Sequence, residues 1–122
     1  MKAKKFKIIK NKLGDIQKVI SKKSQNFKGF GELYISSIKP KKSKGWNMHK
    51  KMTINIFVIK GKIQITEKYK NQIIKKILTE SSREIVTIKP MRWVKYKNLE
   101  KKESKIINFA NYLHNKKELL KK

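Results

Sequence analysis

Residues 46–59 alternate polar and apolar side chains, and this stretch holds most of the groups that could do chemistry. Alternate side chains of a β-strand point to opposite faces of its sheet. If the stretch is one strand, its apolar face consists of Met48, Met52, Ile54, Ile56 and Val58. Its other face is a row of hydrogen-bonding groups: Asn47, His49, Lys51, Thr53 and Asn55. We therefore expect the polar face to line a pocket while the apolar face packs on a core.

His49 is the candidate general base on this polar face. The pKa of an unperturbed histidine, ~6.5, suits it to proton transfer at neutral pH. Lys44 and Lys51 could bind a diphosphate, or stabilise a developing enolate by their charge. Tyr34 and Tyr96 could supply a proton from the opposite side of a ligand.

Structural roles are the alternative for all of these residues. A lone histidine on a strand is often a structural or surface residue, and Lys51, Thr53 and Asn55 could form a solvated sheet face. Trp46 and Trp93 are either core residues or stacking platforms for a base or sugar. Of the two, Trp93 is the one that we expect beside a substrate.

The metal-ligating residues are too few for a metal centre. The chain has two histidines, His49 and His114, and Glu32 is the carboxylate that could join them. A protein site for a transition metal needs at least three ligands of this kind. Gly-rich phosphate loops, nucleophile elbows and paired carboxylates are also missing from the sequence. We expect neither a metal nor another cofactor.

Short β-type runs recur along the chain. Gly14-Asp15 predicts a tight turn between two short strands, with a helix over 15–23 as the alternative. Further strands are predicted at Glu32–Ile38, Lys62–Thr66, Ile73–Leu78, Glu84–Ile88, Arg92–Tyr96 and Ser104–Ala110. We also expect a hairpin-like connection at Lys60-Gly61, a loop over Glu67–Gln72 and a C-terminal helix over Leu113–Lys122. Eight or nine short strands at regular spacing predict an all-β, mostly antiparallel sandwich or barrel, here as one domain spanning 1–122.

The charge of the chain is strongly basic, with 34 basic and 8 acidic residues and a formal net charge of +26. Arg83 and Arg92 are the only arginines. Since arginine is the favoured residue for bidentate phosphate and base recognition, nucleic-acid binding is the least favoured interpretation. A genome rich in A and T, which inflates Lys, Ile and Asn together, explains the composition better, and a phosphorylated small molecule is the alternative anionic partner. With no cysteine, no apolar run of membrane-spanning length and no signal-peptide pattern, we expect a cytoplasmic protein without membrane contact.

Several segments, taken in order, resemble a known family. They are 31–36 (Gly-Glu-Leu-Tyr-Ile-Ser), 44–53 (Lys-Gly-Trp-Asn-Met-His-Lys-Lys-Met-Thr), 61–63, 87–96 (Thr-Ile-Lys-Pro-Met-Arg-Trp-Val-Lys-Tyr) and 104–114. Together they are similar to the dTDP-4-dehydrorhamnose 3,5-epimerase-like branch of the cupins, whose relatives include the dTDP-sugar 3,4-ketoisomerases. In two places the sequence differs from that pattern. Asn47 replaces the first histidine of a His-x-His pair, and Val94 replaces a histidine at the pocket rim.

This resemblance implies a cupin jelly roll, usually a homodimer, that acts without a metal on a nucleotide-linked 4-keto-6-deoxy sugar in surface-polysaccharide biosynthesis. It implies His49 as the base that removes the proton next to the ketone, with Tyr96 or Tyr34 working opposite it. The two substitutions leave a second interpretation open, in which the protein is a non-catalytic sugar-nucleotide-binding homologue.

Overall fold

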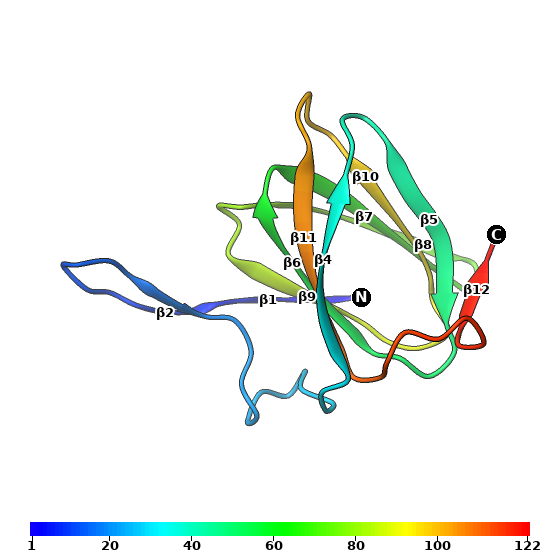
Figure 1. The fold of residues 1–122 in the computed structure, drawn as a ribbon, viewed down its shortest axis with the longest axis horizontal. Helices are drawn as coiled ribbons and strands as arrows, with labels where there is room; N and C mark the ends of the chain where they lie inside the picture. Colours follow the sequence, from blue (N-terminus) through cyan, green and yellow to red (C-terminus); the bar gives the residue numbers. More distant parts are fainter.

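The computed structural model describes residues 1–122, which form twelve strands and no helix. Neighbouring strands pair antiparallel throughout. One sheet has, in spatial order, Lys2–Lys5 (β1), Glu84–Ile88 (β9), Ile54–Lys60 (β6), Ser104–Ala110 (β11) and Glu32–Ile38 (β4). The second has Leu119–Lys121 (β12), Ser43–His49 (β5), Trp93–Asn98 (β10), Lys62–Tyr69 (β7) and Gln72–Thr79 (β8). The all-β, antiparallel prediction is confirmed (Figure 1).

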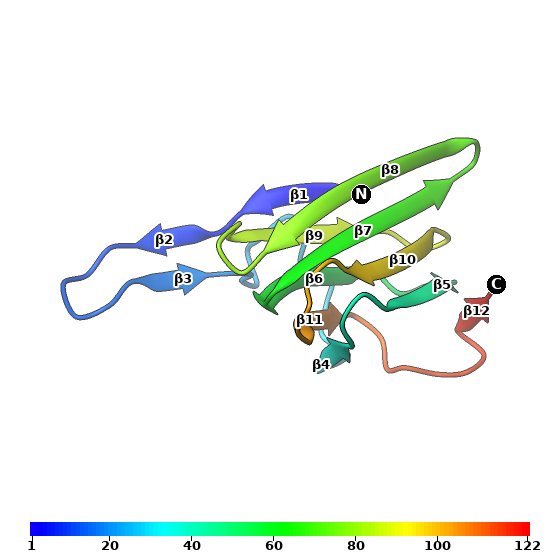
Figure 2. The same cartoon turned by 90° about the horizontal axis from the view of Figure 1, so that it is seen from above.

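A third, two-stranded unit consists of Lys7–Ile9 (β2) and Ile16–Lys18 (β3). It projects away from the two large sheets, as Figure 2 shows. The turn between its strands is held by Asp15, whose carboxylate accepts the backbone N–H of Asn11 at 3.1 Å and the Nζ of Lys10 at 3.0 Å. The predicted turn at Gly14-Asp15 is therefore confirmed, and the alternative helix over 15–23 is wrong.

The core lies between the two five-stranded sheets and follows from the period-2 alternation of their strands. Along β11 every second residue is buried, from Ser104 to Ala110, and β7 alternates in the same way. All buried apolar side chains except Ile85 form one cluster: Ile38, Met52, Ile54, Ile56, Val58, Ile63, Ile65, Leu78, Val86, Ile88, Val94, Ile106 and Ala110. Burying a branched aliphatic side chain contributes about 1.5–3 kcal/mol, so this cluster is the main source of stability.

The expected single strand over 46–59 is two strands in different sheets. β5 ends at His49 and β6 begins at Ile54. Between them, the backbone N–H groups of Lys51 and Met52 donate to Glu118 Oε1, at 2.5 and 2.7 Å. Since side chains of the C-terminal segment satisfy these donors in place of a neighbouring strand, the chain is free to leave one sheet for the other. The predicted common face of the five polar residues is therefore wrong.

Two expected connections also differ from the structure. Lys60-Gly61 is not a hairpin turn, because β6 and β7 belong to opposite sheets and this step carries the chain between them. Gly61 has φ +87°, and a Cβ there would overlap the side chain of Ser104. The predicted loop over Glu67–Gln72 is largely strand, since β7 continues to Tyr69 and β8 begins at Gln72.

The predicted C-terminal helix over Leu113–Lys122 is wrong. The end of the chain forms β12, which pairs with β5 so that Leu119 lies opposite His49. Backbone bonds from Lys50 N to Glu118 O (3.0 Å) and from Lys122 N to Trp46 O (3.2 Å) extend this pairing. A ten-residue helix is only marginally stable by itself, whereas the open edge of β5 offers a ready-made row of hydrogen-bonding partners. The structure contains no helix long and apolar enough to cross a membrane.

Candidate active site

A cavity of about 110 Å³ lies between the two sheets. Its apolar wall comes from the core: Met52, Ile54, Ile88, Val94 and Ile106. Its polar wall contains Tyr34 and Ser36 of β4, Lys44, Asn47 and His49 of β5, Tyr96 of β10, Asn108 of β11, and Lys89 and Arg92 from the connection between β9 and β10. Because inward-facing residues alternate along a strand, Tyr34 and Ser36 of β4 reach the cavity together, as do Asn47 and His49 of β5.

The cavity brings together five of the residues singled out from the sequence: Tyr34, Lys44, Asn47, His49 and Tyr96. Gly45 allows β5 to reach this position, since a Cβ at that residue would lie 2.5 Å from the carbonyl oxygen of Val94. The register between β5 and β10 shifts at this point, between Val94 and Lys95. The extra residue of β5, Trp46, places Lys44 on the cavity side together with Asn47 and His49, although Lys44 and Asn47 are three positions apart.

The other predicted substrate-binding residues lie elsewhere. Lys51 is exposed in the turn after β5, and Thr53 lines a different surface depression. Asn55 packs on the far side of its sheet, where it donates to Asn26 O and accepts from Thr87. Trp93 alternates with Val94 and so faces away from the cavity, with the Nζ of Lys122 5.4 Å from its ring centroid. Lys51, Thr53 and Asn55 do not line the cavity because the strand ends at His49 and the chain passes to the other sheet.

His49 is only partly exposed, and its Nδ1 is buried without a hydrogen-bond partner. Burial lowers the pKa of His49 below the ordinary histidine value of 6.5. The Glu118 carboxylate opposes this effect and raises the pKa, while His114 lowers it further. The two imidazole rings lie edge to face, with centroids 6.4 Å apart. At neutral pH His49 is therefore neutral and can accept a proton.

Tyr34 and Tyr96 remain protonated. Burial raises the pKa of Tyr34, and the nearby charge of Glu32 adds to the rise. Burial raises the pKa of Tyr96 far more, with a smaller contribution from Tyr34. A tyrosine in this state can donate a hydrogen bond or a proton to an oxygen that becomes negative. The cavity thus holds a neutral base together with two hydroxyl donors.

Three cationic side chains border the cavity. Lys44 donates to Ser36 Oγ at 3.0 Å. Lys89 and Arg92 also border the next depression along the surface. The Arg92 guanidinium stacks on the Tyr69 ring, 3.4 Å from the ring centroid, and donates to Pro90 O at 3.0 Å. No carboxylate pairs with Arg92.

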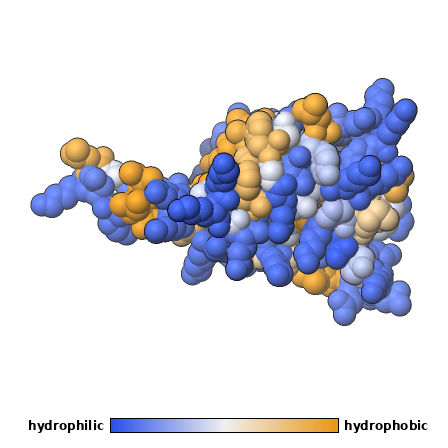
Figure 3. Space-filling model, turned by 90° about the horizontal axis from the view of Figure 1, so that it is seen from below, coloured by the Kyte–Doolittle hydropathy of each residue, from blue (hydrophilic) through white to orange (hydrophobic).

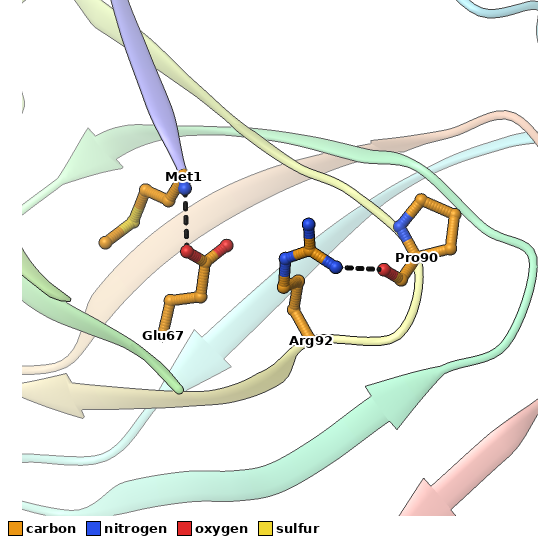
Figure 4. Close-up of polar contacts among 4 residues, drawn as sticks. All are labelled: Met1, Glu67, Pro90 and Arg92. Atoms are coloured by element: carbon orange, nitrogen blue, oxygen red, sulfur yellow. Dashed lines mark hydrogen bonds and ion pairs between the residues drawn. The ribbon is translucent and has the colours of Figure 1, made fainter. Parts of the chain in front are cut away.

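Figure 4 shows that the carboxylate next to Arg92 is already engaged. Glu67 is 3% exposed, and its Oε1 accepts from the Met1 amino group at 2.7 Å. Glu67 Oε2 has no hydrogen-bond partner and forms no ion pair with Arg92, so the charge of Arg92 is left available to an anionic ligand.

Sequence reasoning missed four polar residues of the cavity: Ser36, Lys89, Arg92 and Asn108. Ser36 follows from period 2, because it shares a strand face with Tyr34. Asn108 could have been found in the same way from the inward positions of β11. Lys89 and Arg92 lie in an irregular connection, where alternation predicts nothing. No three histidine, cysteine, aspartate or glutamate side chains are grouped so that they could hold a metal ion.

Solved structures share this fold. A dTDP sugar isomerase from Desulfovibrio desulfuricans G20 superimposes with a TM-score of 0.88 at 19% identity, over 99% of this chain and 82% of the other. A variant of the 3,4-ketoisomerase QdtA from Thermoanaerobacterium thermosaccharolyticum, in complex with TDP-4-keto-6-deoxyglucose, gives 0.85 at 19% identity, over 99% and 86%. A dTDP-4-dehydrorhamnose 3,5-epimerase from Elizabethkingia anophelis NUHP1 gives 0.86 at 10% identity, over 98% and 73%.

These likenesses confirm the jelly-roll cupin fold. No curated protein matches the chain. The model of one protein family, described as FdtA, WxcM-like, C-terminal, matches residues 1–122. The two sheets, the cavity between them and this match over the full chain lead to one assignment: the protein belongs to the WxcM-like, C-terminal family.

Proposed function

We propose that this protein is a metal-independent isomerase or epimerase that acts on a dTDP-linked 4-keto-6-deoxy sugar in surface-polysaccharide biosynthesis in the cytoplasm. The observation that carries the proposal is the position of His49, a histidine whose pKa is lowered, in one cavity with two protonated tyrosines. The family and the sugar-nucleotide isomerases among the similar structures support the substrate class.

The chemistry begins with loss of the proton on the carbon next to the keto group. His49 accepts this proton, and the carbonyl oxygen takes up the electron pair as an enolate. Lys44 and the hydroxyl of Tyr34 or Tyr96 stabilise the negative oxygen. Return of a proton to the same carbon from the opposite face inverts it. Return to the former carbonyl carbon, with transfer of the neighbouring hydroxyl proton, moves the ketone by one position.

The size of the cavity limits what it can hold. A volume of about 110 Å³ is well below the roughly 300–1,000 Å³ of pockets that enclose a whole drug-sized ligand. It suits part of a sugar and excludes the nucleotide. Lys89 and Arg92 then lie where the cavity meets the neighbouring depression and can hold the diphosphate.

A non-catalytic sugar-nucleotide-binding protein is the second candidate. The observation that favours it is that no carboxylate accepts a hydrogen bond from His49 Nδ1. A base without an orienting partner is a poorer catalyst. A nucleic-acid-binding role is the third, and rests on the charge alone.

Incubation with dTDP-4-keto-6-deoxyglucose in heavy water tests the proposal. The enzyme is expected to introduce deuterium at the carbon beside the ketone, as read by mass spectrometry and NMR. A thermal shift with dTDP and no deuterium incorporation would favour the non-catalytic binder. DNA binding whose affinity falls steeply with salt, without any response to dTDP, would favour the third function.

We also propose that the protein is a homodimer, and that β4 lies at its interface. β4 is an edge strand, and its Leu33 and Ile35 are 55% and 60% exposed. The projecting hairpin exposes Leu13 and Ile16 as well. Figure 3 shows apolar residues both along this hairpin and over part of the body. An open edge with apolar side chains suits pairing with a second copy.

A further inference from the structure

Asn108 is a buried polar residue of the cavity that the mechanism above does not use. It lies on β11 between the inward-facing Ile106 and Ala110, and its side chain is 3% exposed. On the neighbouring strand it pairs with Tyr34. β11 and β5 belong to opposite sheets, so Asn108 and His49 reach the cavity from its two sides.

The amide of Asn108 differs from the other two buried asparagines. Asn55 donates through Nδ2 to a backbone carbonyl and accepts through Oδ1 from Thr87. Asn98 donates to two carbonyls and accepts from Ser104 Oγ at 2.8 Å and from Glu100 N at 2.9 Å. Asn108 has a buried Nδ2 that bonds to no group of the chain. The first two asparagines therefore have structural roles that Asn108 does not share.

A buried amide without partners destabilises a fold, because its hydrogen bonds to water are lost and no hydrogen bonds within the protein replace them. An apolar residue would suit the core better, as Ile106 on the same strand shows. A ligand that accepts a hydrogen bond from Asn108 Nδ2 would explain why an amide stands at this position. His49, whose Nδ1 also lacks a hydrogen-bond partner, lines the same small cavity, so one ligand can contact both residues.

We propose that Asn108 recognises the sugar ring, with its amide hydrogen-bonded to a hydroxyl or keto oxygen of the bound sugar. This inference rests on the proposed function and adds a specificity-determining residue to it. A side-chain amide offers both a hydrogen-bond donor and an acceptor, which match the hydroxyl and keto groups of a sugar. We expect no contact between Asn108 and the nucleotide. A site built around such a bond discriminates strongly against ligands that lack the oxygen.

The test uses Asn108→Ala, which removes the amide without adding bulk, and Asn108→Asp, which keeps its shape and removes the donor. Asn55→Ala is the matched control for stability. Because Asn108→Ala breaks no hydrogen bond within the chain, its melting temperature is expected to stay closer to that of the wild type than that of Asn55→Ala. A loss of melting temperature in Asn108→Ala as large as in Asn55→Ala would assign Asn108 a structural role and overturn the proposal.

Ligand binding is measured for the same variants by calorimetry with dTDP and with dTDP-4-keto-6-deoxyglucose. Affinity for dTDP is expected to stay within twofold of the wild type, while affinity for the sugar nucleotide falls about tenfold. Equal affinity of the wild type and Asn108→Ala for the sugar nucleotide would overturn the role of Asn108 alone. Absence of sugar-nucleotide binding by the wild type would overturn the proposed function as well. If Asn108→Asp fails to fold, the affinities of Asn108→Ala for the two ligands test the proposal.

Discussion

Pairing of the last strand with β5 places Glu118 close to His49. Leu119, the residue after Glu118, lies opposite His49 in the pairing of β12 with β5. The Glu118 carboxylate accepts the N–H groups of Lys51 and Met52 and acts on His49 by its charge. One residue thus ends the strand that carries the candidate base and opposes the effect of burial on that base.

Replacing His49 by Asn is expected to remove proton exchange and spare the fold. The amide fills similar space but cannot accept a proton, and loss of a general base lowers rates by roughly 10²–10⁴-fold. Deuterium incorporation in heavy water measures the loss, with circular dichroism as the check on folding. Exchange at the wild-type rate in the variant would contradict the assignment of the base.

Replacing Glu118 by Gln is expected to move the acidic limb of the kcat/KM profile to lower pH. The amide oxygen can still accept the two backbone N–H groups, but the charge that raises the pKa of His49 is lost. The pKa then falls further, and His49 remains a neutral base at more acidic pH. A profile that stays in place, or moves to higher pH, would contradict the effect of the Glu118 charge on the pKa of His49.

The stability of the protein is expected to fall as the pH drops below about 6.5. The pKa of His49 is lower in the folded chain than in the unfolded chain, so the unfolded chain binds the proton first. The contribution of this group decreases between the unfolded pKa and the lowered folded one. Urea unfolding at a series of pH values, compared between the wild type and His49→Asn, isolates it. Parallel curves for the two proteins would contradict the lowered pKa.

Lys44 and Lys51 form a matched pair of variants. Lys44 borders the cavity, whereas Lys51 lies outside it in the turn after β5. Lys44→Met is expected to raise KM or lower kcat for the sugar nucleotide about tenfold, and Lys51→Met to change both less than twofold. Steady-state kinetics at two salt concentrations separates a local contact from a general effect of charge. Equal losses in the two variants would point to the charge of the whole surface.

Gly61→Ala is expected to destabilise the fold by about 1–3 kcal/mol. Gly61 has a positive φ, and a Cβ would overlap Ser104, so both the backbone and its neighbour must shift. Chemical denaturation measures the change. Gly14→Ala is the matched control, because Gly14 also has a positive φ but a Cβ there would contact nothing. The difference between the two variants gives the contribution of the overlap.

Much of the fold could be predicted from alternation along the chain. The strands Glu32–Ile38, Glu84–Ile88 and Ser104–Ala110 have the bounds expected from their apolar patterns. Along Ser104–Ala110 every second residue is buried, and along most of Glu32–Ile38 more and less exposed residues alternate, so period 2 can be seen in the residue types. Glu84–Ile88 is buried on both faces, since Ile85 and Val86 are both buried. Asn47 and His49 could be placed at one pocket by the same alternation, whereas Lys44 joins them through the bulge at Trp46.

Tertiary structure decided where that strand ends and what its continuation faces. Residues 50–53 keep the same alternation as β5, but Glu118 and Asn111 bind their backbone N–H groups and turn the chain into the other sheet. The local sequence pattern cannot indicate these hydrogen bonds, because their partners lie 58 to 67 positions away in the chain. The pairing of β12 with β5 also joins segments that are far apart in the chain, so it could not be predicted from local composition. As a result, a segment with helical composition forms a strand. Alternation along the sequence therefore determined most of the strands and the shared face of Asn47 and His49, and contacts between distant segments determined which other residues join His49 at the cavity.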